Sequence, residues 1–551
     1  MHLHLRHVVV ILVVVIVVGS SLPLKAAETN EILRQRIETI HETGALQIGE
    51  AQIMAIRAIP VLYENRGFEL VWTRPAMVDE LMSAIAAAPA HGLDPEDYHY
   101  EALTARLDIA AKGLTGATST VNLDLLLTDA LARYAFTLHF GKLDPEDLDP
   151  VWNLSREYGD DDIVDHFFGV FETGKITHFL DEASPQFLIY RRLMDALTGY
   201  RELAAAGGWP TVPDGPGLKK GQRDTRVADL RARLAMTDGL QTGAGDDSEA
   251  FDDAVEEAVI RFQRRHGLDP DGKVGPKTID ALNVSAEARV DQIRANLERT
   301  RWVFRDMDDD FIIADIAGFR LRLFRDNEPV WTTRIQVGKP YHATPVFTEK
   351  MTYLVLNPTW TIPPGILRKE TLPKARKDPD YLKNRNMSVI RSDGSVVDPA
   401  TVDFNGKFPY GIRQEPGPKN ALGRVKFIFP NPYFVYFHDT PSKSLFSRSD
   451  RAFSHGCIRT ENPLDLAELL LADKEGWDRT RIDKVIKSEK MTTVTLAEPM
   501  TVFLLYWTAN PQPEGTVHFR DDIYSRDAKI IEGLAKPFQF KRPGNLPASL
   551  Q

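Results

Sequence analysis

The chain contains a single cysteine, Cys457, which lies in the hexapeptide Ser454-His455-Gly456-Cys457-Ile458-Arg459. A thiol attacks as its thiolate, so a nucleophilic cysteine needs a base or a cation close to it. Two histidines are near in the sequence: His455 lies two residues before Cys457, and His438 lies at the end of a predicted strand. This combination predicts a cysteine nucleophile, for which we assign Cys457, with His438 as its general base.

The segment Tyr433-Phe434-Val435-Tyr436-Phe437-His438 reads as a strand. Side chains alternate between the two faces of a strand, so Tyr436 and His438 are predicted to share one face, together with Phe434. A hydroxyl beside an imidazole suits a base next to a substrate or oxyanion contact. We assign His455 to the catalytic residues in a supporting role; it orients the base, binds substrate or, as the alternative, only holds the loop.

The hexapeptide also supplies backbone donors for a developing negative charge. Gly456 permits a positive φ and a close approach of the backbone to substrate. The amides of Gly456 and Cys457 are therefore predicted to form an oxyanion hole, where fixed donors contribute most to the rate. Asn462 and Pro463 read as the N-cap and first position of a helix that runs to Leu470.

A zinc site is the alternative chemistry for these residues, because His438, His455 and Cys457 are all zinc-ligand types. No fourth ligand is evident in the sequence. We therefore expect no metal and no cofactor.

The elements around this site are predicted to be mostly β. β-branched and aromatic residues bounded by turn signals predict strands at 311–315, 320–325, 330–337, 353–357, 425–429, 433–438, 493–497 and 500–507. Residues 361–423 separate two of these strands, with some helical character at 369–383. That is long for a loop within a compact domain, so we interpret it as a functional insert or lid.

The preceding residues are predicted to be helical. Residues 1–27 have the layout of a secretory signal, with a short charged start, an apolar run at 8–18 and small residues before a cut. An uncleaved membrane anchor is the alternative, although the run is short for a bilayer span. Apolar residues at helical spacing predict a helical unit over 28–210 and a second, three-helix unit over 222–285. Residues 536–551 are predicted to form a flexible tail.

Composition limits the function classes. Apolar residues make up 43% and charged residues 26% of the 551, which is typical of globular domains with real cores. The net charge of −11 makes nucleic acid an unexpected partner. An exported protein with one cysteine cannot form an internal disulfide, which favours a reactive role for the thiol.

The small helical unit resembles a known domain. Its residues Phe262-Gln263-Arg264-Arg265-His266-Gly267-Leu268, followed by Asp271-Gly272-Lys273-Val274-Gly275, are similar to the peptidoglycan-binding domain of many cell-wall enzymes. The alternative is a purely structural three-helix spacer, because bundle helices need the same apolar stripes.

The C-terminal part resembles the L,D-transpeptidase (YkuD-type) family. The resemblance rests on His438, a gap of fifteen residues and the Ser454–Arg459 hexapeptide, and it extends to three further motifs: Val337-Gly338-Lys339-Pro340 with Thr344-Pro345, Pro416 to Gly423, and Tyr506-Trp507-Thr508-Ala509 with Phe519-Arg520-Asp521-Asp522. It covers roughly residues 290–535. The layout is similar to large multidomain Gram-negative members, which carry a capping insert.

The resemblance implies a fold and a reaction. The expected architecture is multidomain α+β: a helical N-terminal scaffold, a small three-helix peptidoglycan-binding domain, and a mostly β catalytic domain at 290–535 with a capping insert at 361–423. In the family a cysteine attacks the stem tetrapeptide after its third residue, D-alanine leaves, and an amine of a second stem accepts the acyl group, giving a 3→3 cross-link. Peptidoglycan stem peptides and glycan strands are the implied partners, the periplasm is the implied location, and carbapenem-type β-lactams are the implied covalent inhibitors.

Carried over position by position, the resemblance makes Cys457 the nucleophile, His438 the base, and Tyr436 and Trp360 aromatic residues of the substrate site. Ser454 and Arg459 are further candidates for substrate binding. Many members have Asn where Arg459 stands, so this arginine either pairs with a substrate carboxylate or braces the loop. Many members have Gly or Ser after the base histidine, and here Asp439 follows; we assign its carboxylate no catalytic role.

Three alternatives stay open at the level of sequence. Water or a lipoprotein lysine is an alternative acceptor for the acyl group, giving an L,D-carboxypeptidase or a lipoprotein-anchoring transferase. A non-catalytic peptidoglycan-binding scaffold is the third. The sequence does not decide the acceptor, the diamino acid of the stem or the oligomeric state.

Overall fold

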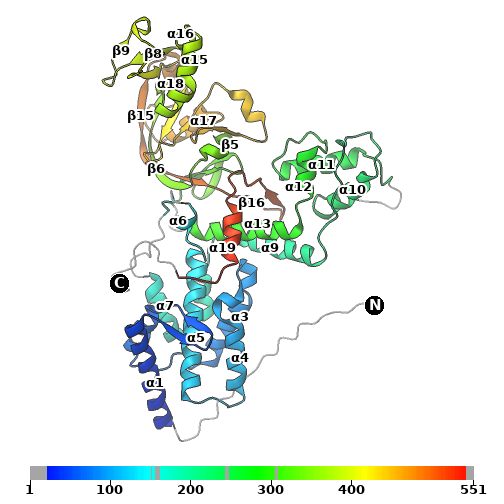
Figure 1. The fold of residues 1–551 in the computed structure, drawn as a ribbon, viewed down its shortest axis with the longest axis vertical. Coiled ribbons are helices and arrows are strands. Elements are labelled where there is room, and N and C mark those ends of the chain that lie inside the picture. Colours follow the sequence, from blue (N-terminus) through cyan, green and yellow to red (C-terminus); the bar gives the residue numbers. More distant parts are fainter. Residues whose placement is uncertain (1–21, 150–151, 155–161, 242–246, 304–307, 541–551) are drawn as a thin grey trace.

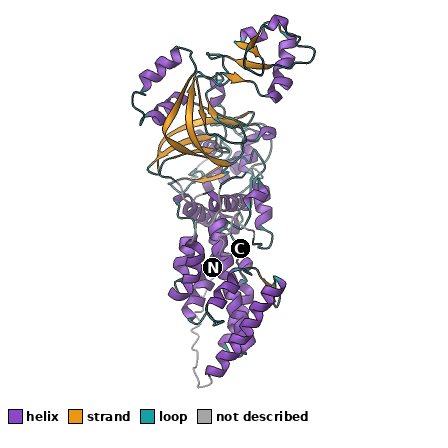
Figure 2. Ribbon diagram, turned by 90° about the vertical axis from the view of Figure 1, so that its left-hand side faces the viewer, coloured by secondary structure: helices purple, strands orange, loops and turns teal. Residues whose placement is uncertain are grey.

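The computed structural model describes residues 22–149, 152–154, 162–241, 247–303 and 308–540 of the chain. The molecule is elongated, with a helical unit at one end, a β domain above it, and the small helical unit to one side (Figure 1). Most strands lie beyond residue 310 of the chain. Figure 2 shows them gathered in the part of the molecule away from the helical end. The predicted multidomain α+β architecture is thus confirmed. The apolar run at 8–18 lies outside the described residues, and no helix among those described is both long and apolar enough to cross a bilayer.

The N-terminal helical unit is built around α5 (Ala117–Phe140), whose residues are buried on nearly every side. Around it lie α1 (Leu22–Thr43), a short hairpin of β1 (Leu46–Ile48) and β2 (Ala51–Ile53), α2 (Ala58–Asn65), α3 (Pro75–Ala86), α4 (Tyr100–Ala111), α7 (Asp162–Thr173) and α8 (Ile176–Ala183). The short helix α6 (Pro145–Leu148) follows α5 in the chain, and α9 (Leu188–Ala205) packs against α13 (Ala286–Val303) instead. The side chains of Asp94 and Asp144 each accept a hydrogen bond from the amide two residues on, which starts the following helical turn.

The small helical unit contains α10 (Arg226–Thr237), α11 (Asp253–Arg265) and α12 (Pro276–Leu282). The Asp252 side chain caps α11 by accepting from the Val255 amide, and Gly267 beyond its end has a φ of 67°. The predicted apolar stripes meet in one core that includes Val227, Leu230 and Phe262. The three predicted helices are all present.

Helix α13 (Ala286–Val303) joins the units that the sequence predicted as separate. It packs against α9, against α19 (Asp527–Leu534) and beside the hairpin of β16 (Ala509–Pro511) and β17 (Val517–Phe519). Leu193 and Leu297 share one buried cluster with Phe519. The expected boundary at 290 falls inside α13, which packs against both α9 and the β16–β17 hairpin.

The C-terminal half contains a nine-stranded sheet in the order β13-β5-β14-β12-β11-β6-β15-β3-β4, and a further pairing of β4 with β5 closes it on itself. Its strands are β3 (Phe311–Asp315), β4 (Arg320–Arg325), β5 (Glu328–Gly338), β6 (Phe347–Leu356), β11 (Val425–Ile428), β12 (Phe437–His438), β13 (Ala452–Ser454), β14 (Ile458–Thr460) and β15 (Thr492–Leu505). The apolar sides of these strands fill the enclosed core. Two predicted strands, 493–497 and 500–507, are one strand, β15. Its register against β6 shifts between Thr495 and Met500, a bulge that accommodates Pro499.

Two local predictions in this half are wrong. Residues 433–436 are not strand, because the Asn431 side chain accepts from the amides of Tyr433 and Val435 and donates to two carbonyls, which makes a turn. Phe434 therefore has a φ of 55° and is 83% exposed, rather than sharing the strand face. Asn462 precedes α17 (Pro463–Leu471) as predicted, but it is left-handed at a φ of 51° and its side chain makes no cap bond.

The insert folds as a unit of its own at the far end of the molecule (Figure 1). It contains β7 (Trp360–Thr361), α14 (Pro364–Ile366), the π-helical turn η4 (Leu367–Thr371), α15 (Leu372–Lys377), α16 (Tyr381–Asn384), β8 (Met387–Ile390), β9 (Val396–Val397) and β10 (Gly411–Gln414). Its four strands pair antiparallel in the order β7-β10-β8-β9 around a separate apolar core. An insert with its own apolar core can move as one rigid unit, whereas a loop without a core cannot.

The predicted tail departs from expectation over its described part. Residues 536–540 follow α19 back to the N-terminal unit, where Phe538 is 5% exposed and packs against Phe136 and Phe140. The Phe538 amide donates to the Asp97 carboxylate at 3.1 Å. Burial of these aromatic rings outweighs the polar, Pro-containing composition that suggested flexibility.

Candidate active site

The parallel pairing of β12 with β14 brings the candidate residues together. Phe437 is level with Ile458 and His438 with Arg459 in this register, and the Ile458 amide donates to the Tyr436 carbonyl at 3.2 Å. Cys457 immediately precedes β14, so it lies beside Tyr436. Because side chains alternate along strands, the four residues Tyr436, His438, Cys457 and Arg459 project to the same side of the sheet.

The Cys457 thiol is half-buried and hydrogen-bonded. Its Sγ donates to the Phe434 carbonyl at 3.6 Å. Burial raises the pKa of the Cys457 thiol, while hydrogen bonds from the Tyr436 amide and hydroxyl and the charge of Arg459 act in the opposite direction. Burial has the largest effect, so at neutral pH the resting group is a neutral thiol.

His438 is 4% exposed, and its Nδ1 lies 2.5 Å from the carbonyl oxygen of Asp439. A carbonyl only accepts, so Nδ1 carries the proton and the Nε2 lone pair of the neutral ring stays open. Burial, then the charge of Arg459, lowers the pKa of His438 to about 3; the hydrogen bond to the Asp439 carbonyl acts in the opposite direction, and the charge of Lys426 adds a smaller lowering. The imidazole is therefore neutral at pH 7, and the resting site holds no thiolate–imidazolium pair.

The Asp439 carboxylate has a backbone role. It accepts from the amides of Arg424 at 2.8 Å and Thr440 at 2.7 Å and forms an ion pair with Lys443. A Cβ at Gly423 would lie 2.3 Å from this side chain, and Gly423 also has a φ of 63°, which explains the glycine at the end of the 416–423 motif.

The loop before Cys457 is held by two hydroxyls. Ser454 is 2% exposed, donates to the Cys457 carbonyl at 2.5 Å, and accepts from the Gly456 amide at 3.1 Å. Thr344 donates to the Gly456 carbonyl at 2.8 Å. Gly456 has the positive φ that its type suggested, 114°.

These contacts correct two sequence-based assignments. The Gly456 amide is bound to Ser454, so it does not point into an oxyanion hole, and Ser454 is buried in the loop rather than exposed to substrate. The Cys457 amide and the Tyr436 hydroxyl remain as the candidate oxyanion donors. The reason is local: a Ser two residues before a Gly can accept that amide, which satisfies a donor in a buried turn.

His455 contacts the insert and a neighbouring histidine. Its Nε2 lies 2.7 Å from Oε1 of Glu370 in η4 of the insert, and its ring centroid lies 5.1 Å from that of His342. Of the three roles left open by the sequence, this geometry favours the last, a hold on the loop. Glu370 itself could not be found from the sequence, because it is 85 residues away and carries no motif.

Arg459 and Trp360 lie in different parts of the site. Arg459 donates through Nη1 to Gln336 at 3.1 Å, and its Nε is buried without a hydrogen-bond partner among the described residues. Trp360 lies in β7 and packs against the core of the insert. In the parts of the chain that the structure describes, no three His, Cys, Asp or Glu side chains are grouped so as to hold a metal ion.

Comparison with known families places these units. Residues 309–494 match the family model described as the L,D-transpeptidase catalytic domain, and the candidate residues Tyr436, His438, Cys457 and Arg459 all lie within that span. Residues 309–494 are thus similar to L,D-transpeptidase catalytic domains. Residues 57–197 match a family described as the scaffold domain, and residues 223–282 match one described as "Putative peptidoglycan binding domain". The resemblance stated from the sequence is confirmed.

Two curated relatives cover part of the chain. A protein of Haemophilus influenzae named "Putative L,D-transpeptidase" is 37% identical over 253 residues, 45% of this chain and 51% of the relative. A protein of Bacillus licheniformis named "Probable N-acetylmuramoyl-L-alanine amidase" is 32% identical over 143 residues, 25% of this chain and 39% of the relative. The matched region thus spans about half of the first relative and less of the second.

Solved structures give weaker likenesses. The Ldtfm–avibactam carbamoyl enzyme is 12% identical, over 36% of this chain and 49% of that chain, with a TM-score of 0.18. An L,D-transpeptidase fragment from Xylanimonas cellulosilytica is 15% identical, over 53% of this chain and 99% of that chain, with a TM-score of 0.17. TM-scores this low carry no structural argument.

Proposed function

We propose that the protein is a peptidoglycan L,D-transpeptidase that forms 3→3 cross-links through an acyl-enzyme on Cys457. The observation that carries the proposal is the arrangement of Cys457 beside Tyr436, two residues before Arg459, which is level with His438 in the pairing of β12 with β14. These residues lie inside the span that matches an L,D-transpeptidase catalytic domain. Peptidoglycan chemistry is supported independently by the match of residues 223–282 to a peptidoglycan-binding family.

Acylation begins from neutral partners. Nε2 of His438 takes the thiol proton as Sγ attacks the carbonyl after the third stem residue, and the Cys457 amide and Tyr436 hydroxyl donate to the oxyanion. The tetrahedral intermediate collapses with cleavage of the C–N bond, and the imidazolium returns its proton to the leaving D-alanine amine. Because burial disfavours both charged forms, thiolate and imidazolium exist only while the substrate is present.

The second half-reaction repeats these steps with a new nucleophile. An amine of a second stem loses a proton to His438 and attacks the thioester carbonyl. The C–S bond breaks, an amide forms, and the proton returns to Sγ. Arg459, whose buried Nε has no hydrogen-bond partner in the part of the chain that the structure describes, is proposed to donate to a carboxylate of the stem.

The small helical unit is proposed to hold the glycan beside this chemistry. A cavity of about 380 Å³ lies in this unit, between the segment around Leu218 and α12. Its lining includes Leu218, Gln263 and Thr278. Ser449 of the catalytic domain also lines it, and the Ser449 amide donates to Asp269 at 3.1 Å. This contact fixes the cavity next to the catalytic domain.

The remaining expectations are part of the same proposal. The enzyme is exported to the periplasm by residues 1–27, through cleavage or as a membrane anchor, and its working units are those predicted at 28–210, 222–285 and 290–535. Carbapenem-type β-lactams acylate Cys457, because their strained carbonyl meets the same thiol and base.

The test is incubation with a disaccharide-tetrapeptide, followed by mass spectrometry. We expect a dimer lacking one D-alanine from the wild type and no product from Cys457→Ala. His438→Gln, which keeps the volume of the side chain but removes the base, is expected to lose activity while still folding. If tripeptide monomer is the only product, the reaction is hydrolysis rather than cross-linking. If the acyl group is transferred only to a lysine peptide, the reaction is lipoprotein anchoring. Unchanged turnover by Cys457→Ala would end the proposal.

A further inference from the structure

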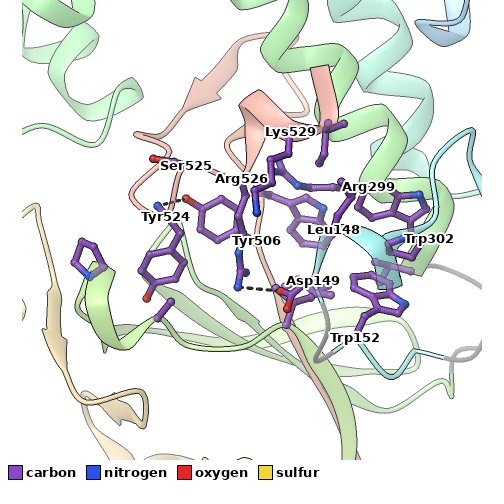
Figure 3. Close-up of a pocket in the computed structure, with 18 residues that line it drawn as sticks. Leu148, Asp149, Trp152, Arg299, Trp302, Tyr506, Tyr524, Ser525, Arg526 and Lys529 are labelled. Carbon is purple, nitrogen blue, oxygen red and sulfur yellow. Dashed lines mark hydrogen bonds and ion pairs between the residues drawn. The ribbon is translucent and has the colours of Figure 1, made fainter. Parts of the chain in front are cut away.

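A second cavity lies outside the active site, where the N-terminal unit, α13 and the catalytic domain meet. Its volume is about 310 Å³, within the range of small-molecule sites. Figure 3 shows Tyr506, Tyr524 and Arg526 along one side, with Trp152 and Trp302 across from them. No step proposed above uses this cavity.

The cavity has a cationic side with spare donors. Arg299 of α13 pairs with Asp527 at 2.5 Å, and Arg526 pairs with Asp149 at 3.0 Å. Nη2 of Arg299 and Nη1 of Arg526 are nevertheless buried without a hydrogen-bond partner among the described residues. The Arg299 side chain is only 7% exposed, so this unpaired donor is deeply buried.

Buried guanidinium donors are normally satisfied, so two of them at one cavity need an explanation. Lys529, also in the lining, adds a third positive charge. Asp149 and Asp527 form ion pairs with the arginines, although Oδ1 of Asp527 has no hydrogen bond of normal geometry among the described residues. Asp522 accepts from the Tyr506 hydroxyl at 2.7 Å. An oxyanion from outside the chain would satisfy both free N–H groups.

The other sides of the cavity are aromatic. Trp152 and Trp302 meet edge to face with ring centroids 5.6 Å apart, and Tyr506 and Tyr524 stack at 5.5 Å. The Arg526 guanidinium lies 5.2 Å from the Tyr506 ring centroid, which fixes its plane against the wall. Flat aromatic walls favour a ligand that has a ring or a flat apolar face as well as its charge.

We propose that this cavity is a second binding site, for a small organic anion that carries its carboxylate on a ring, such as a sugar acid. The carboxylate lies between Arg299 and Arg526, and the ring lies against Trp152 and Trp302. The choice of a sugar acid rests on the proposed function, because the muramic acid of a glycan strand carries a free lactyl carboxylate wherever its stem peptide has been removed.

The cavity is connected to the catalytic loop by hydrogen bonds. The Tyr524 hydroxyl donates to the Gly338 carbonyl at 2.6 Å and accepts from the Thr344 amide at 3.2 Å. The Thr344 hydroxyl in turn donates to the carbonyl of Gly456, the residue before Cys457. An occupant that moves Tyr524 therefore acts on the loop that carries the thiol.

Binding is tested on Cys457→Ala, so that no turnover occurs and failure of the proposed chemistry does not affect the result. Calorimetric titrations use N-acetylmuramic acid, N-acetylglucosamine as the neutral ring, and lactate as the carboxylate without a ring. We expect N-acetylmuramic acid to bind at least about tenfold more tightly than either part. Lactate and inorganic phosphate binding as well as the sugar acid would reduce the site to a simple anion site and overturn the proposal.

Arg526→Gln is the main variant, because Arg526 is less buried than Arg299 and its loss is less disruptive. We expect an affinity loss of about tenfold or more, with Arg526→Lys intermediate and Arg481→Gln, an exposed arginine of α18 (Arg479–Lys487), unchanged. Trp152→Leu gives a second readout that leaves both arginines in place, and it is expected to weaken the sugar acid but not lactate. Equal affinities for Arg526→Gln and Arg481→Gln, or no binding of any probe, would refute the site.

The coupling is tested separately in the otherwise native enzyme. A carbapenem acylates Cys457 in the presence and absence of N-acetylmuramic acid, and intact-protein mass spectrometry follows the adduct. We expect the acylation rate to change in the native chain and to be insensitive to the sugar acid in Tyr524→Phe, which lacks the hydroxyl link. A sugar effect that persists in Tyr524→Phe would rule out this route.

Discussion

His455 and Glu370 join the catalytic loop to the insert across a separation of 85 residues, with Nε2 and Oε1 2.7 Å apart. Their side chains are 31% and 43% exposed, so solvent screens the pair and it contributes little to the free energy of folding. A weak contact between a separately folded insert and the segment that carries the nucleophile suits a closure that opens and re-forms during turnover.

Removing this contact is expected to change access rather than stability. In Glu370→Gln the free energy of unfolding should change by less than about 1 kcal/mol. The insert is then held less tightly, so a small carbapenem should acylate Cys457 several-fold faster, whereas KM for the larger stem peptide should rise. Intact-protein mass spectrometry gives the acylation rate. Glu489→Gln, a surface carboxylate that pairs with Arg424 instead, is the matched control. Identical acylation rates for the two variants would show that the contact does not limit access.

The pH profile of acylation should lack the usual histidine limb. The pKa of His438 is lowered to about 3, so the proton-accepting form is lost only as the pH falls toward that value. The carbapenem acylation rate is expected to be flat between about pH 5 and pH 8. Arg459→Met removes one of the two charges that lower this pKa and should move the acid limb upward, although still below the ordinary value because burial remains. A rise with a midpoint near pH 6.5 in the wild type would contradict the buried neutral base.

Gly338 cannot accept a side chain. A Cβ there would lie 2.0 Å from the His342 carbonyl oxygen and 2.9 Å from the Thr344 amide. Gly338→Ala is expected to cost about 1–3 kcal/mol of unfolding free energy by forcing this turn apart. It should also slow acylation, since Thr344 holds Gly456. Urea unfolding measures the first effect. Gly365→Ala in the insert, where a Cβ meets nothing within 4 Å, should be close to neutral.

Ser454 is expected to matter through the loop rather than through substrate binding. Ser454→Ala removes the hydrogen bonds to the Cys457 carbonyl and from the Gly456 amide, which should cost about 1–3 kcal/mol because buried groups lose their partner. The freed loop should lower kcat with little change in KM. A steady-state comparison with Ser454→Thr, which keeps the hydroxyl, separates an effect on the loop from an effect on substrate binding. A rise in KM at constant kcat would restore the substrate-binding assignment.

Strands flanked by clear turn signals were predictable from the sequence. The spans 311–315 and 320–325 match β3 and β4, because alternation and turn residues coincide there. The strand pattern failed where a side chain competes with the backbone. The Asn431 side chain binds the amides of Tyr433 and Val435, which a strand would have paired, so residues 433–436 form a turn instead of a strand. The bulge in β15 and the docking of Phe538 depend on partners far away in the chain, which local patterns do not contain.

The site was predictable in its members but not in its contacts. Cys457, His438 and Tyr436 are adjacent because β12 and β14 pair in parallel, and their alternation was visible in the sequence. The role of the Gly456 amide was not visible in the sequence, because the loop geometry decides whether this amide points at substrate or at a neighbouring hydroxyl. Glu370, Lys426 and Thr344 reach the site from other elements, so only the folded chain reveals them.

Helix α13 limits how the protein can be divided. Ile293 and Leu297 are fully buried between α9 and the β16–β17 hairpin. A fragment that started at residue 309, where the matched catalytic span begins, would leave Ala509, Val517 and Phe519 facing water. Such a piece should aggregate during purification, whereas one that starts upstream of α9 should stay monodisperse.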